Sequence, residues 1–110
     1  MAKIQLGEFE EIVLLTVAVL YDEAYGVAIK REIEERLDRS VSVGALQSAL
    51  RRMETKGFLE SRLGEATKVR GGKRKRFFTV TPYGKQALTE VRDARLQLWQ
   101  AIPRIMWEGI

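Results

Sequence analysis

Apolar residues recur with helical spacing in the first half of the chain. The first predicted helix follows Gly7 and, after an acidic first turn, has almost no polar face. Its apolar residues are Phe9, Ile12, Val13, Leu15, Val17, Val19 and Leu20. A helix that is apolar nearly all round is buried on several sides. Residues 25–37 then keep apolar side chains on one side only, at Ile29, Ile33 and Leu37, which predicts an amphipathic second helix.

A third helix is predicted after Ser42, whose hydroxyl suits an N-cap, and should stop at Gly57. Its apolar stripe consists of Leu46, Ala49, Leu50 and Met53. The opposite face carries Gly44, Gln47, Ser48, Arg51 and Thr55, with Arg52 beside it. Two helices joined by a short turn in this way resemble a helix-turn-helix unit.

After Gly57 the apolar period changes from helical to alternating. Leu59, Ser61 and Leu63 face one way, and beyond Gly71 and Gly72 the alternation resumes at Phe77, Phe78, Thr79 and Val80. This pattern predicts a β-hairpin with a long basic tip. A hairpin added to three helices makes a winged helix.

A last helix is predicted from Thr81 and Pro82, because proline at the first helical position sacrifices no hydrogen bond. Pro103 predicts a kink or an early stop. The apolar residues have heptad-like spacing, with Trp99 beside them, and form the expected dimer interface: Leu88, Val91, Leu98, Trp99, Ile102 and Ile105. A second copy of the chain is the simplest cover for a stripe this long.

Together these elements predict a mainly α protein with a small β-hairpin. A winged helix-turn-helix would span residues 1–81, and a long C-terminal dimerisation helix would span residues 82–110 of the same compact unit.

Composition excludes most enzyme classes. The 110 residues include neither Cys nor His. Disulfides, thiolate nucleophiles, the usual zinc sites and imidazole catalysis are therefore excluded. We expect the acidic groups at Glu8, Glu10, Glu11, Glu34 and Glu35 to be structural, since no base or nucleophile accompanies them. The chain is predicted not to be an enzyme and to need no cofactor or metal.

The longest apolar run, over residues 12–20, is too short for a bilayer, which requires about 20 apolar residues. Its acidic flank also differs from a secretory signal. We predict a cytoplasmic protein without a membrane partner.

Positive charge is concentrated in one segment. The net charge is +4, yet residues 66–76 alone supply six positive charges and no acid, at Lys68, Arg70, Lys73, Arg74, Lys75 and Arg76. Such a local cluster indicates a polyanion partner, with a solvated charge run as the alternative. Arg, Gln and Ser on the third helix suit base and phosphate contacts in a major groove, although they also suit an ordinary wet face. The predicted DNA-binding residues are Ser42, Gln47, Ser48, Arg51, Arg52, Lys73, Arg74, Lys75 and Arg76.

From about Leu6 to Leu88 the chain resembles the PadR family of winged-helix transcriptional regulators. The matching pieces are Gly26 with Ile29, residues 42–46, residues 49–54 with Gly57, residues 71–81, and Gly84. Val27 and Gln47 stand where the family usually has tyrosines.

The resemblance implies a homodimeric repressor of the short subfamily, with one C-terminal helix at the dimer interface and an inverted-repeat operator in double-stranded DNA. It also implies a small aromatic or cationic effector that binds between the subunits and weakens DNA binding. Trp99 is a candidate residue for binding that effector, or else it is part of the dimer core. The alternative is a winged-helix protein-interaction module whose basic hairpin meets an acidic protein surface.

Overall fold

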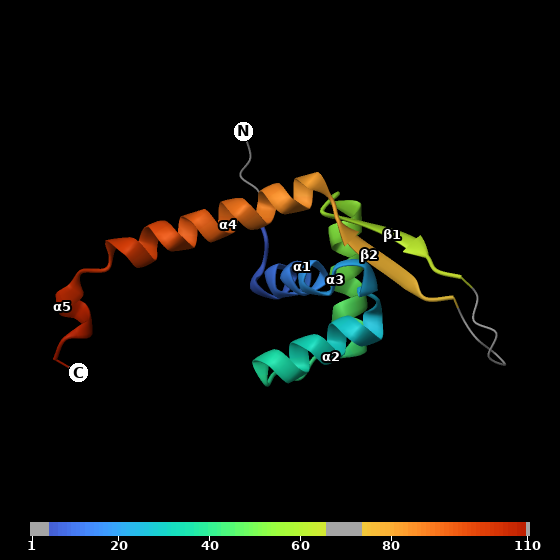
Figure 1. The fold of residues 1–110 in the computed structure, drawn as a ribbon, viewed down its shortest axis with the longest axis horizontal. Helices are drawn as coiled ribbons and strands as arrows, with labels where there is room; N and C mark the ends of the chain where they lie inside the picture. Colours follow the sequence, from blue (N-terminus) through green and yellow to red (C-terminus); the bar gives the residue numbers. More distant parts are fainter. Residues whose placement is uncertain (1–4, 66–73, 110) are drawn as a thin grey trace.

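The computed structural model describes residues 5–65 and 74–109. The elements are α1 (Glu8–Leu20), a 3-10 turn η1 (Tyr21–Glu23), α2 (Gly26–Leu37), α3 (Val43–Thr55), β1 (Leu59–Leu63), β2 (Arg76–Val80), α4 (Pro82–Ala101) and α5 (Arg104–Trp107). The predicted mainly α fold with a β-hairpin is confirmed (Figure 1). The expected hairpin-tip residues Lys68, Arg70, Gly71, Gly72 and Lys73 lie outside the described residues.

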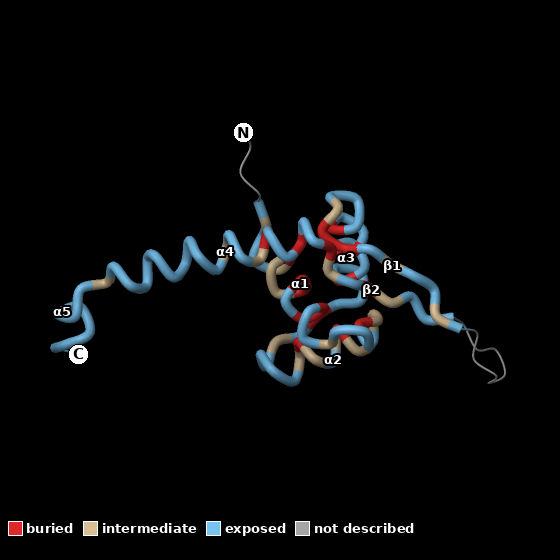
Figure 2. The backbone as a smooth tube through the Cα atoms, turned by 45° about the horizontal axis from the view of Figure 1, so that its top comes forward, coloured by how far each residue is buried: buried red, intermediate tan, exposed pale blue. Residues whose placement is uncertain are grey.

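The core lies where α1, α2 and α3 meet, and buried backbone is concentrated there (Figure 2). The predicted α3 stripe is buried, and so are Ile29 and Ile33 of the α2 stripe, but Leu37 is 51% exposed. The expectation that α1 is buried on several sides is wrong at Leu15 and Val19, which are 45% and 56% exposed. The largest fully buried side chains are Val13, Leu14 and Val17 of α1, Ile29 and Ile33 of α2, Leu46, Leu50 and Met53 of α3, and Leu59 of β1.

The two ends of α3 have the predicted caps. The Ser42 hydroxyl accepts a hydrogen bond from the Ala45 N–H at 3.1 Å, as an N-cap does. After the last turn, Gly57 adopts a φ of 86°, and the Phe58 N–H returns to the Met53 carbonyl at 2.9 Å. The chain therefore leaves α3 directly into β1.

The hairpin is antiparallel, with Leu59 opposite Val80 and Leu63 opposite Arg76. Its root is attached to the segment before α2, since the Phe78 N–H donates to the Ala24 carbonyl at 2.8 Å. Leu59 is buried, but Leu63 is 45% exposed because the hairpin projects beyond the helices (Figure 1). Of Leu59, Ser61 and Leu63, which were predicted to face one way, only Leu59 at the root is fully buried.

Helix α4 begins in the core and then leaves it (Figures 1 and 2). Ala87 is fully buried, whereas Leu98 is 73% exposed. The radius of gyration is 17.0 Å, compared with about 13 Å for a compact domain of about 100 residues. The second half of α4 therefore lacks a covering element within the described chain.

The predicted interruption at Pro103 is confirmed. Helix α4 ends at Ala101, and the short α5 follows, so Ile105 belongs to α5 and the heptad spacing does not continue along one helix. The indole rings of Trp99 and Trp107 stack across the break, with centroids 6.0 Å apart and planes within 5°. Among the described helices, none is both long and apolar enough to cross a bilayer.

Candidate nucleic-acid interface

Helix α3 has one buried and one exposed face. Each residue of its apolar stripe is at most 2% exposed. Gln47, Ser48 and Arg51 lie on the exposed side. Within residues 5–65 and 74–109, Arg51 forms no ion pair, so its guanidinium can meet an external acceptor.

Arg52, which the sequence placed beside that face, turns toward α1. Its Nε lies 3.4 Å from Oε2 of Glu10, and the Nζ of Lys56 lies 3.2 Å from the same oxygen. Glu10 is only 8% exposed and also accepts the Gly7 N–H at 3.1 Å. Burial raises the pKa of Glu10, but Gly7, Lys56 and Arg52 together outweigh it and hold that pKa below its ordinary value. Arg52 therefore fastens α3 to α1 in this structure.

The N-terminal end of α3 carries two other candidates, Ser42 and Gln47. The Ser42 oxygen is engaged as the N-cap. The Nε2 of Gln47 lies 3.2 Å from the point where a Cβ on Gly26 would stand. The missing side chain at Gly26 thus makes room for Gln47 against the first turn of α2.

Three of the four predicted hairpin cations, Arg74, Lys75 and Arg76, lie at the end of the hairpin away from its root, where Arg76 is opposite Leu63. The fourth, Lys73, lies outside the described residues. The Nε of Arg74 donates to the Gly64 carbonyl at 2.6 Å. The Nζ of Lys75 lies 4.2 Å from the centre of the Tyr25 ring, a cation–π contact. The first contact ties Arg74 to the segment after β1, and the second holds Lys75 at the start of α2.

Arg76 belongs to a chain of hydrogen bonds that joins the hairpin to α3. Its Nη1 donates to the Ser61 hydroxyl at 2.9 Å, and that hydroxyl donates to Oε2 of Glu54 at 2.5 Å. Glu54 is near the end of α3, so this link from Arg76 through Ser61 to Glu54 ties the direction of the hairpin to the helix.

The turn between α2 and α3 is held by Glu34. Its Oε2 accepts the Val41 N–H at 3.0 Å, and both carboxylate oxygens lie 3.0 Å from the Nζ of Lys30. The Val41 N–H first, and Lys30 second, lower the pKa of Glu34. Glu10 and Glu34 thus have contacts that fit the structural roles expected for them.

A groove of about 470 Å³ opens between the start of α2, the first half of α3 and residues 74–78 of the hairpin. None of its described lining residues is acidic, and four are cations: Lys30, Arg74, Lys75 and Arg76. A concave basic surface attracts polyanions. We call this surface the basic groove.

Tyr25, Lys30 and Val43 also line the basic groove, although the sequence analysis did not place them among the DNA-binding residues. Val43 is four residues before Gln47, a spacing that places both on one side of a helix and could have indicated it. For Tyr25 and Lys30 the sequence holds no comparable signal, because their position depends on how α2 meets the hairpin.

The residues predicted for a dimer interface divide into two groups. Leu88 and Val91 are half-buried, and Leu88 packs against the core of its own chain. Ile102 is half-buried at the break before α5. Leu98, Trp99 and Ile105 are 73%, 61% and 75% exposed.

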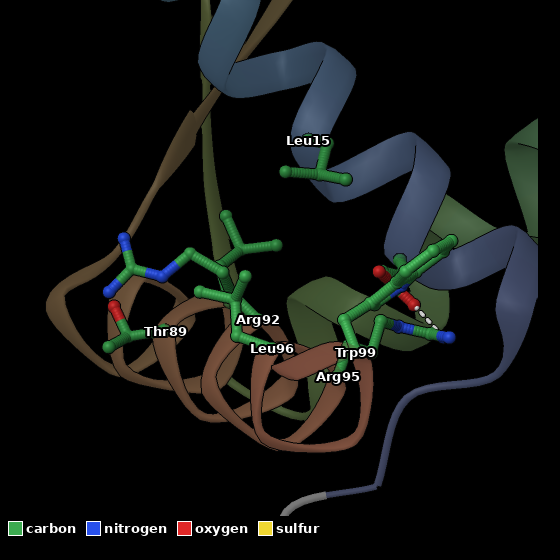
Figure 3. Close-up of a pocket in the computed structure, with 8 residues that line it drawn as sticks. Leu15, Thr89, Arg92, Arg95, Leu96 and Trp99 are labelled. Carbon is green, nitrogen blue, oxygen red and sulfur yellow. Dashed lines mark hydrogen bonds and ion pairs between the residues drawn. The ribbon is translucent and has the colours of Figure 1, made fainter. Parts of the chain in front are cut away.

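A second groove, of about 390 Å³, separates α1 from α4 (Figure 3). Leu15 points into it from α1, while Leu96 and Trp99 line it from α4. One ion pair crosses between the helices, from Nη2 of Arg95 to Oε1 of Glu11, at 2.7 Å. We call this surface the α1–α4 groove.

Comparison with known proteins gives this geometry a context. The sequence pattern of the Transcriptional regulator PadR-like family matches residues 14–90. A search of curated protein sequences finds no match.

Several solved structures resemble the chain. A PadR-like transcription factor from Bacteroides fragilis is 24% identical over 84% of both chains, with a TM-score of 0.71. The RosR–S4 complex from H. salinarum is 27% identical over 90% of this chain and 78% of that chain, with a TM-score of 0.70. A PadR family transcription regulator from Clostridium difficile R20291 is 26% identical over 84% of this chain and 91% of that one, with a TM-score of 0.64.

Proposed function

Because the chain belongs to the PadR-like family of transcriptional regulators, we propose that it is a homodimeric repressor that binds an inverted-repeat operator in double-stranded DNA. Its family consists of transcription regulators, and we assign this chain no catalytic role. Its place of action would be the cytoplasm, where the operator lies.

The basic groove is the observation that carries this proposal. Gln47 of α3 lines this groove between the start of α2 and the hairpin cations Arg74, Lys75 and Arg76. Ser48 and Arg51 lie on the exposed side of the same helix, outside the lining of the groove. A recognition helix enters the major groove, and flanking cations meet the phosphates on either side. Arg52 is assigned a positioning role, because its partner is Glu10.

We propose that a second copy of the chain covers the outer half of α4. The apolar α1–α4 groove and the exposed Leu98 and Trp99 support this assignment, since an uncovered apolar surface is costly in water. A two-fold axis there would set two α3 helices at successive major-groove faces, about 34–36 Å apart. Residues 1–81 would then read DNA, and residues 82–110 would set the spacing.

We also propose that a small aromatic or cationic effector binds at Trp99 between the two subunits. Trp99 presents a flat, largely exposed ring to the α1–α4 groove, and the Arg95–Glu11 pair lies in the same groove. A ligand that stacks there would shift the spacing of the two α3 helices and release the operator. Tryptophan fluorescence should change when a flat aromatic dye is titrated in.

The DNA-binding proposal is tested by selecting fragments from a random duplex pool with the purified protein. We expect an inverted repeat, bound with log K that falls linearly with log salt concentration. Replacing Arg74, Lys75 and Arg76 by Gln should reduce that slope by about 0.9 for each phosphate that is no longer neutralised. Failure to enrich any sequence would overturn the proposal.

A paired substitution tests base recognition. Arg51→Ala should change the preferred operator, because a good arginine–guanine contact contributes about 1–3 kcal/mol of discrimination. Arg31→Ala removes an exposed arginine of α2, a helix to which we assign no base contact, so its operator preference should match the wild type. Identical preferences in the two variants would show that α3 does not read bases through Arg51.

A further inference from the structure

We infer that Val43 recognises the methyl group of a thymine in each operator half-site, close to an adenine recognised by Gln47. This inference rests on the DNA-binding function proposed above and adds to it the base composition that the helix selects. It concerns an apolar contact, whereas the other candidates on α3 are polar.

The position of Val43 in the basic groove is the first observation. Val43 is the first residue of α3 and is 61% exposed. It lines the basic groove together with Gln47 and with the hairpin cations Arg74, Lys75 and Arg76. The N-terminal residues of a recognition helix are the ones that contact base edges. Val43 thus stands where bases are read, and its isopropyl group offers only an apolar contact.

The chemistry of the major groove then limits what Val43 can recognise. The thymine methyl is the apolar group that a base pair displays there, and glutamine forms a bidentate pair with N6 and N7 of adenine. Val43 and Gln47 are one helical turn apart, about 6 Å along the axis. Base pairs are stacked about 3.4 Å apart, so the two side chains reach bases within about two steps. The half-site should therefore place a thymine and an adenine that close together.

Gly44 supplies an independent observation. A Cβ added at Gly44 would meet nothing within 4 Å, so packing inside the chain does not require glycine there. Glycine also lowers helix stability relative to alanine. Its exposed position next to Val43 fits a different need, the close approach of the helix backbone to a ligand. At this end of α3, that ligand would be the base edges.

The experiment removes single methyl groups from DNA. Each thymine of the selected operator is replaced in turn by deoxyuridine, which lacks only the methyl, and the dissociation constant is measured. We expect one thymine per half-site whose replacement lowers affinity about four-fold, because burying one methyl group contributes about 0.8 kcal/mol. Replacing that thymine in both half-sites should lower affinity about sixteen-fold. Val43→Ala should bind the two duplexes equally. Leu37→Ala, an exposed apolar position outside the basic groove, should discriminate like the wild type.

Gly44→Ala gives a second readout that does not depend on Val43. This variant should be at least as stable as the wild type and should bind the operator more weakly. Unchanged operator affinity in Gly44→Ala would overturn the close approach of the α3 backbone to the bases. The inference about Val43 would be overturned if removing thymine methyls did not change affinity, or if Val43→Ala still distinguished thymine from deoxyuridine. Either result would leave DNA binding itself intact. Absence of any sequence-selective, salt-dependent binding would instead overturn the proposed function.

Discussion

Gly84 in the first turn of α4 is the position where the smallest change should have the largest effect on stability. A Cβ built on Gly84 would lie 2.3 Å from the Phe58 carbonyl oxygen and 2.8 Å from Cγ1 of Val80. The Phe58 backbone cannot retreat easily, because its carbonyl accepts the Thr81 N–H at 3.1 Å and its own N–H donates to Met53 at 2.9 Å. Gly84→Ala must therefore displace α4 from the root of the hairpin.

Overpacking a core usually costs about 1–3 kcal/mol, and more where backbone must move. The better helix propensity of alanine returns at most about 1 kcal/mol. We expect Gly84→Ala to lower the free energy of unfolding by about 2–3 kcal/mol, which corresponds to about 10 °C in Tm for a domain of this size. Gly44→Ala is the matched control, since its Cβ meets nothing within 4 Å and should raise stability by about 0.4–1 kcal/mol.

The measurement is urea unfolding followed by circular dichroism, with all variants at one protein concentration because a dimer's stability depends on it. The two glycine variants should move the midpoint in opposite directions. A Gly84→Ala protein as stable as the wild type would refute the close packing of α4 on Phe58.

Three other substitutions test the dimer, the hairpin and the ion pairs of Glu10. Leu98→Lys changes a site that is 73% exposed in the single chain, so the fold should persist while sedimentation shows a monomer and operator affinity falls sharply; a monomer with wild-type affinity would argue against the dimer. Ser61→Ala breaks the link from Arg76 to Glu54, so it should weaken operator binding a few-fold while lowering the free energy of unfolding by less than about 1 kcal/mol. Operator affinity is measured by fluorescence anisotropy, and an unchanged affinity would show that this link does not position the hairpin for DNA. Because the pKa of folded Glu10 is lowered, its ionised form stabilises the protein above about pH 4.5, and this contribution is lost as the pH falls through the lowered pKa. Glu10→Gln should therefore be less stable than the wild type at pH 7, with a deficit that shrinks as the pH falls below 4.5; a deficit that does not change with pH would contradict this.

Local features of the chain could be predicted from the sequence alone. The caps at Ser42 and Thr81, the stop at Gly57 and the interruption at Pro103 all depend on residues within one turn of each other. The apolar stripe of α3 was predicted for the same reason, since helical spacing determines which side chains share a face. The resemblance to the PadR family added the order of the elements and their expected partner, DNA.

Contacts between distant segments were decided only by the tertiary structure. Arg51 and Arg52 are neighbours in sequence, yet Arg52 pairs with Glu10, which is 42 residues away, and leaves Arg51 to the exposed side. The sequence could not show this, because a long arginine side chain takes the direction of whichever carboxylate the fold brings near it. The basic groove has the same origin: Lys30, Val43 and Lys75 line one surface only because α2, α3 and the hairpin meet there.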